Sequence, residues 1–270
     1  MTSFEQIDPD LFYPDSDGKP MADNTEQYRW IVLIKENLEI LFANNDHVLI
    51  AGDLLWYPVR SRLIAPTAPD VMVVFGRPKG KRRSYPQWQE DNIPPQVVFE
   101  ILSYSNDTKE MERKLEFYDT YGIEEYYLYD PESFQLDGWL RQNNHLNKLW
   151  QMDGWLSPRL GIRFQTGLGE LVIYRPDRQR FLNSLELNQQ AEQAELLLKQ
   201  ERQRAQQLAE QHICVISALI LIIFRNWGAG SKGAGSREQG RRVFPPALHT
   251  PPLCLFSMPQ NRVAYCSGGE

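Results

Sequence analysis

Residues 96–130 place a strand-like run, a helical segment and a second strand-like run in direct succession. The run 96–103 (QVVFEILS) is apolar and β-branched, which favours a buried strand. Segment 107–121 repeats apolar residues at helical spacing and meets a stop at Gly122. The aromatic run 125–129 (EYYLY) predicts another strand, ending at an Asp-Pro turn. This succession predicts a packed α/β core.

The preceding residues supply the rest of that core. Segment 24–42 predicts an amphipathic helix, and Asn24 with Gln27 resembles a capping box. Runs 47–57 (HVLIAGDLLWY) and 70–75 (DVMVVF) predict two strands. The predicted order is therefore α-β-β-β-α-β.

Downstream runs extend this core. Runs near Trp139 and over 171–174 are expected to add edge strands, with a loop and a short strand over 154–164 between them. Residues 184–211 are rich in Gln, Glu, Ala and Leu with a 4-3 spacing, which predicts a long exposed helix. Two interpretations stay open for it: a weak coiled coil or a solvated single helix.

The chain changes character near residue 212. The first 211 residues hold 23 basic and 33 acidic side chains, a net charge of −10, and the last 59 hold 6 and 2, a net charge of +4. A Gln- and Glu-rich helix meets the apolar run 213–224 without a cap, and Gly, Ser, Arg and Pro dominate from 226 onward. We expect 212–270 to have little order. Our hypothesis is that it arose from a frameshift or read-through.

Cysteine usage and hydropathy bear on location. All three cysteines follow residue 212, so the main body has no thiol for a disulfide, a zinc site or a nucleophile, and a cytoplasmic home is expected. The segment 1–20 lacks the pattern of a signal peptide. The apolar run 213–224 has 12 residues, whereas a spanning helix needs about 20. No membrane partner is expected.

Two carboxylates stand out by context. Asp70 opens a buried-looking strand, and Glu100 lies inside another among apolar neighbours. A charge there is costly to desolvate unless it is paired or binds a cation. A structural salt bridge is one interpretation of Glu100. If the two strands are neighbours, both carboxylates can instead converge on one point, where oxygen ligands suit Mg²⁺.

Lys114 lies on the helical segment that follows the Glu100 strand, so it could reach back over the strand end. An amine beside such a metal can act on the attacking water and offset developing phosphate charge. Other chemistries find little support. The chain has neither a Gly-rich phosphate loop of known type nor a Gly-x-Ser-x-Gly elbow, and its four histidines are scattered.

A family resemblance joins these residues. Pro69-Asp70, the run 98–103 (VFEILS), and SYSNDTKEMERKLEFYDTYGIEEYYLYDP with its helical Lys114 resemble the Uma2 family, also called DUF820. Its members are restriction-endonuclease-like proteins abundant in cyanobacteria. The resemblance covers about residues 24–180 and extends more loosely through the Gln- and Glu-rich helix.

The resemblance implies the PD-(D/E)xK fold: an α/β restriction endonuclease-like core with a mixed central sheet flanked by helices, in the order α-β-β-β-α-β. It implies that Asp70 and Glu100, with the carbonyl of Ile101, hold Mg²⁺ or Mn²⁺. The usual pattern places lysine two residues after the glutamate, where this chain has Leu102. The family lysine corresponds here to Lys114.

A basic run, RPKGKRR, lies between the two acidic strands. It is either a solvated loop or a place for phosphate contacts. The candidates are Lys79, Lys81, Arg82 and Arg83, with Ser103, whose other interpretation is a helix cap.

The expected function is Mg²⁺-dependent hydrolysis of phosphodiester bonds in DNA. The alternative is a catalytically silent module of the same fold that binds a nucleic acid or a protein. Homodimerisation is a further expectation, since cutting both strands commonly needs two sites. It too comes from the resemblance.

Overall fold

The structure is a computed structural model that describes residues 13–16, 18, 22–104, 108–167 and 169–229. Most of the expected N-terminal arm (1–23), residues 105–107 (Ser, Asn and Asp), and the tail from 230 lie outside the described residues. The chain divides into two units, Met1–Glu201 and Arg202–Glu270, and each is described by itself.

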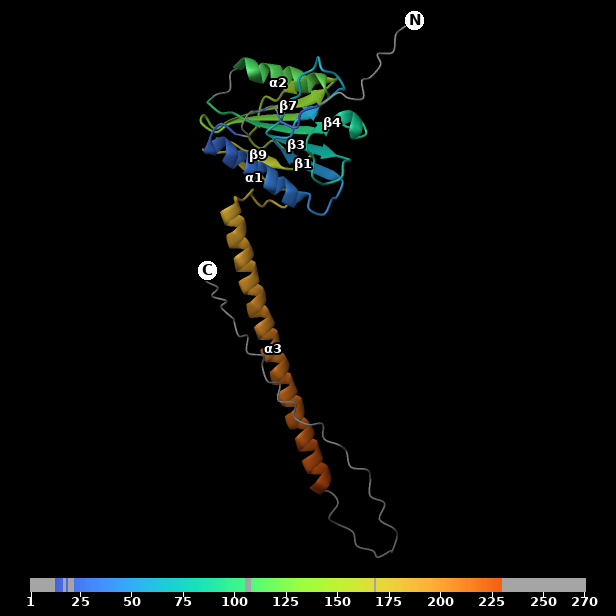
Figure 1. The fold of residues 1–270 in the computed structure, drawn as a ribbon. Helices are drawn as coiled ribbons and strands as arrows, with labels where there is room; N and C mark the ends of the chain where they lie inside the picture. The colour runs from blue at the N-terminus through green and yellow to red at the C-terminus, as the bar shows by residue number, and fades with distance from the viewer. Residues whose placement is uncertain (1–12, 17, 19–21, 105–107, 168, 230–270) are drawn as a thin grey trace, which may run out of the picture. The chain divides into compact units, whose positions relative to one another are not determined.

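The core is a six-stranded mixed sheet with strand order β1-β3-β5-β6-β7-β8. Figure 1 shows this sheet within the first unit, with β1, β3 and β7 labelled. Its strands are β1 (Val48–Gly52), β3 (Val71–Phe75), β5 (Val97–Ile101), β6 (Glu125–Asp130), β7 (Gln135–Gln142) and β8 (His145–Lys148). Strands β5 and β6 are parallel and are joined by helix α2 (Thr108–Thr120), whereas every other neighbouring pair is antiparallel. Together with α1 (Thr25–Leu41), these elements confirm the predicted order α-β-β-β-α-β.

Alternating side chains of the central strands build two apolar layers, one on each face of the sheet. On one face, Trp30, Ile34 and Leu38 of α1 pack with Val73 and Phe99. The other face carries Tyr118 of α2; its sheet members include Met72, Val98 and Tyr126. Because both faces are covered, β3 and β5 are buried along nearly their whole length, as the apolar sequence of β3 and the apolar residues around Glu100 in β5 indicate.

The predicted edge strands differ from the structure in two respects. The run at Trp139 forms β7, an inner strand, because the polar strand β8 pairs outside it. Residues 171–174 do not join the main sheet: β10 (Val172–Tyr174) pairs with β9 (Arg163–Gln165) in a separate two-stranded sheet. A third small sheet pairs β2 (Trp56–Tyr57) with β4 (Tyr85–Pro86), just before a short 3-10 helix, Gln87–Gln89.

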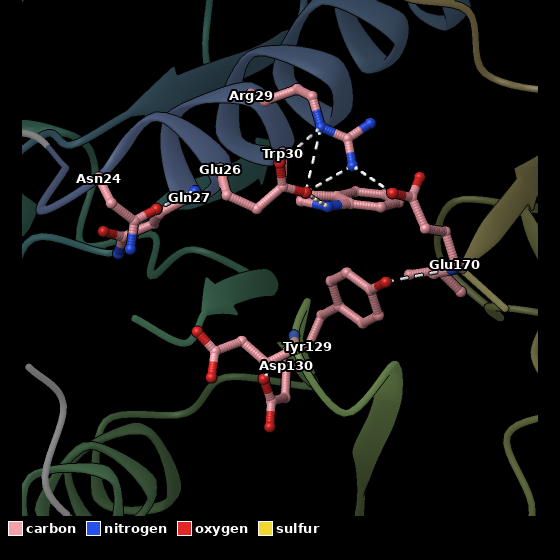
Figure 2. A network of polar contacts seen from close by, with 10 residues as sticks. Asn24, Glu26, Gln27, Arg29, Trp30, Tyr129, Asp130 and Glu170 are labelled. Carbon is pink, nitrogen blue, oxygen red and sulfur yellow. Dashed lines mark hydrogen bonds and ion pairs between the residues drawn. The ribbon is translucent and has the colours of Figure 1, made fainter. Parts of the chain in front are cut away.

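Helix α1 begins at the predicted cap. The side chain of Asn24 accepts a hydrogen bond from the backbone N–H of Gln27 at 2.8 Å, and Gln27 accepts one from the N–H of Asp23 at 2.8 Å. Figure 2 shows the next contacts: Glu26 accepts from Arg29 and from the indole of Trp30, and Arg29 also pairs with Glu170. The first turn of α1 is thereby fixed in place.

Helix α3 (Ser184–Ala229) corrects the prediction of a helix that ends at residue 211. Asn183 and Glu186 form a reciprocal capping box at its start, with bonds of 2.9 and 3.0 Å. The helix continues through the apolar run 213–224, which was expected to have little order. Unbranched and β-branched apolar residues without Gly or Pro propagate a helix that has already begun.

Replacement of Gly122 tests the end of α2. Gly122 has φ +91°, and a Cβ there would meet nothing nearer than Pro94 at 3.8 Å, so backbone conformation alone resists a side chain. We expect Gly122→Ala to lower the free energy of unfolding by about 1–2 kcal/mol. Gly122→Asn should cost less, because Asn tolerates the left-handed region. Urea unfolding measures both, and equal losses would contradict this account.

Candidate active site

Asp70 and Glu100 lie opposite each other on neighbouring strands. Val71 of β3 pairs with Phe99 of β5, and one further step of this antiparallel register brings Asp70 to Glu100. Residues opposite one another share a face of the sheet, with Cα atoms about 5 Å apart. Asp70 is 7% and Glu100 2% exposed. The structure therefore brings the two predicted carboxylates together in a buried place.

Lys114 reaches this pair from α2. Its Nζ donates a hydrogen bond to Oε2 of Glu100 at 2.8 Å, and its side chain is 19% exposed. Tyr118, one turn further along α2, donates its hydroxyl to Oε1 of Glu100 and is fully buried. Residues four apart lie on the same side of a helix, so one face of α2 supplies both contacts. The predicted return of Lys114 to the end of the Glu100 strand is thus present in the structure.

The backbone N–H and carbonyl of Ile101 join three elements. Its N–H donates to Oδ2 of Asp70 at 2.7 Å, and its carbonyl accepts from Nε2 of Gln27 at 3.0 Å. Gln27 lies in the first turn of α1 and is 6% exposed. The sequence predicts for Gln27 only a role in a helix cap. Its position on the same helical face as Ile31 and Ile34 is the available signal, because a polar residue on that face must find a buried partner.

The charges of the site shift the pKa values of its groups. Burial and the nearby Glu100 raise the pKa of Asp70 from 3.8 to about 8, although Lys114 and the N–H of Ile101 oppose the rise. Burial would lower the pKa of Lys114, but Glu100 and Asp70 outweigh burial and raise it. Lys114 is therefore an ammonium group at neutral pH, and Asp70 holds a proton for much of the time when no cation is near.

The donor atoms suit a small hard cation. Among the described residues, no three His, Cys, Asp or Glu side chains form a metal-binding group. Two carboxylates and a carbonyl oxygen nevertheless match Mg²⁺, which keeps several waters and takes one or two carboxylates. Among the described residues, none forms a hydrogen bond with the buried hydroxyl of Tyr126, and burial, followed by the charges of Glu100 and Asp70, raises its pKa. An orphan hydroxyl in the field of both carboxylates is a suitable partner for a water at such an ion.

The basic segment is largely tied to the protein. Arg82 pairs with Glu90 at 2.6 Å, and Nζ of Lys79 donates to two backbone carbonyls that follow α1, at 2.7 and 3.0 Å. Lys81 is exposed, and Arg83 pairs with Asp15 through a side chain that is 87% exposed. Lys79 and Arg82 are thus held by contacts within the protein, whereas Lys81 and Arg83 lie near the surface.

Ser103 donates its hydroxyl to Asp23 at 2.7 Å, on the approach to α1. Helix α2 begins five residues later, at Thr108. Because residues 105–107 lie outside the described residues, the interpretation of Ser103 as a cap of that helix stays a prediction.

Comparison with known proteins adds a family. The family model described as Uma2, "putative restriction endonuclease", matches residues 33–211. The chain belongs to the Uma2 family. A solved structure, a "putative nuclease belonging to DUF820" from Anabaena variabilis ATCC 29413, aligns over 52% of this chain and 74% of its own, at 15% identity and a TM-score of 0.39. A search of curated proteins finds no match.

The Uma2 match spans β1 through β10 and the first part of α3, and thus Asp70, Glu100 and Lys114. It ends at Gln211, where the composition of the chain changes. Gln27 lies before the start of the match. The contact of Gln27 with Ile101 is therefore a contribution of the structure alone.

The raised pKa of Asp70 makes stability depend on pH. The folded protein retains a proton that the unfolded chain releases near pH 3.8, so stability without metal falls as pH rises from about 4 to about 8. We expect Asp70→Asn to remove this part of the decline and to stabilise the metal-free protein at pH 8. Each pKa unit is worth about 1.4 kcal/mol.

Urea unfolding in EDTA at pH 5 and pH 8 measures this effect. Asp46→Asn, at an exposed turn, is the matched control and should keep the pH dependence of the natural chain. The same pH dependence in Asp70→Asn and in the natural chain would contradict the assignment.

Lys114 neutralises the buried carboxylate of Glu100 in β5. Lys114→Ala leaves Glu100 without its cation, and we expect a loss of about 3 kcal/mol in the free energy of unfolding. Arg113→Ala, which removes an exposed cation from the neighbouring position of the same helix, should change stability by less than about 0.5 kcal/mol. Chemical unfolding at pH 7 compares the two, and similar small losses would show that Glu100 does not depend on Lys114.

Proposed function

We propose that this Uma2 protein is a Mg²⁺-dependent endonuclease that hydrolyses phosphodiester bonds in DNA. The observation that carries the proposal is the ion pair of Lys114 with Glu100, which lies opposite Asp70 on the neighbouring strand. A buried pair of acids beside a partly buried ammonium group costs stability, and perturbed groups of this kind gather at functional sites. The family description supports a nuclease.

Asp70, Glu100 and the carbonyl of Ile101 would hold the cation, Mg²⁺ or Mn²⁺. When bound, the ion would act as a Lewis acid toward a phosphodiester oxygen. The contact of Gln27 with the Ile101 carbonyl fixes the direction of that oxygen. The hydroxyl of Tyr118 fixes the Glu100 carboxylate from the other side. Both are positioning residues, because neither needs to touch the substrate.

Lys114 acts through its charge. Its raised pKa keeps the proton on Nζ, so it donates hydrogen bonds and does not remove a proton from water. An ammonium group beside the scissile phosphate would stabilise the extra negative charge of the pentavalent transition state. It would also orient the attacking water through a hydrogen bond from Nζ.

DNA contacts would come from the basic segment and Ser103. Lys81 and Arg83 lie nearest to solvent and are the best placed for phosphates, while Lys79 and Arg82 chiefly hold the segment in position. The first 211 residues carry a net charge of −10, which opposes non-specific binding to a polyanion. We therefore expect binding to depend on local contacts and to weaken steeply with salt.

Plasmid nicking by the full chain with Mg²⁺ or Mn²⁺ tests the proposal. Glu100→Gln keeps the shape of the side chain but removes its charge, so cleavage should fall at least 100-fold. Glu125→Gln is the matched control, since Glu125 is also a buried acid but lies at the opposite end of the β5–β6 pair. It should retain cleavage.

Equal cleavage by the natural chain and Glu100→Gln would overturn the mechanism. Absence of cleavage and of metal affinity in all three folded proteins would favour the alternative, a catalytically silent binding module. Circular dichroism establishes that each variant is folded.

A further inference from the structure

The second half of α3 is apolar around its whole circumference. Nine large hydrophobic side chains between Ile213 and Phe224 are each 48–70% exposed. Successive helical residues advance by about 100°, so these side chains cover every direction except one sector. Cys214 and Ala218 occupy that sector. Ser217 is the one hydroxylated residue of the run.

This arrangement limits what can cover the segment. A second copy of the helix would bury one stripe of each partner and leave the remaining side chains in water. A helix that is apolar on all sides requires an apolar medium on all sides, either the core of a large protein or a lipid bilayer. Among the described residues, none of the most apolar stretch of α3 is buried, and the helix is a candidate for membrane insertion by length and composition.

The charge beyond the segment favours a lipid surface. Residues 225–242 contain five basic side chains and one acidic side chain, a net charge of +4. The segment before it, 184–212, contains three basic and five acidic side chains, a net charge of −2. A cluster of basic residues at one end of an apolar helix attracts anionic headgroups, by about 1 kcal/mol per residue near the surface.

We propose that the segment 213–224 inserts into the hydrocarbon of an anionic lipid bilayer and thereby holds the protein at a membrane surface. Twelve helical residues are about 18 Å long, compared with about 30 Å of hydrocarbon. The expectation of no membrane partner rests on this shortfall, but a helix that lies along the plane of the bilayer needs no complete span, and its basic end then reaches the headgroups. The property belongs to the chain as it stands, whatever the origin of residues 212–270.

Vesicle flotation of the full chain tests the proposal. The protein is synthesised in a cell-free system with vesicles of phosphatidylcholine alone or with 30% phosphatidylglycerol, and the floated fraction is measured. Leu219→Gln with Leu221→Gln should lower the partition onto anionic vesicles at least tenfold. Leu196→Gln with Leu198→Gln is the matched control, with the same residues, spacing and comparable exposure. It should float like the natural chain.

Three outcomes would overturn the proposal. The first is that the natural chain does not float, and the second is that both double variants float equally well. The third is that flotation is absent while the chain assembles without vesicles in a way that depends on Leu219 and Leu221. The last result would assign the segment to contacts between copies of the chain. Equal flotation on neutral and anionic vesicles would overturn the stated preference for anionic lipid.

Discussion

The charge of Glu100 inside β5 is the constraint on which the arrangement of this domain depends. A carboxylate that is 2% exposed needs partners for both oxygens, and Lys114 and Tyr118 supply them from one face of α2. This requirement fixes the rotation of α2 about its own axis as well as its place on the sheet. Hydrophobic packing alone would tolerate small rotations, because apolar contacts have little direction.

Patterns with a single physical cause could be predicted from sequence. The strands β3 and β5 were predictable because both faces of the sheet are covered, which leaves an apolar run in β3 and one interrupted only by Glu100 in β5. The proximity of Asp70 and Glu100 followed once those strands were neighbours. Lys114 came from the family resemblance and from its place on the next helix. The structure then showed that α2 turns this side chain toward Glu100.

Other features depend on contacts that local sequence does not encode. Strand β8 is polar and mostly exposed, so only its pairing with β7 makes it a strand. The run 171–174 resembles any short edge strand, and its separation from the main sheet follows from its pairing with β9. The bond from Gln27 to Ile101 joins residues 74 positions apart. No periodicity in either segment could reveal it.

The backbone contacts of Ile101 also bear on where this domain can be divided. Its N–H and carbonyl are held by Asp70 before β3 and by Gln27 from α1, so the region that forms the site begins at the cap of α1. The family match starts at residue 33, in the middle of that helix. A domain boundary drawn there would keep Asp70, Glu100 and Lys114, yet would remove Gln27, whose side chain donates to the carbonyl of Ile101. The residues that hold the backbone of Ile101 beside Asp70 therefore begin before the part of the chain that the family model matches.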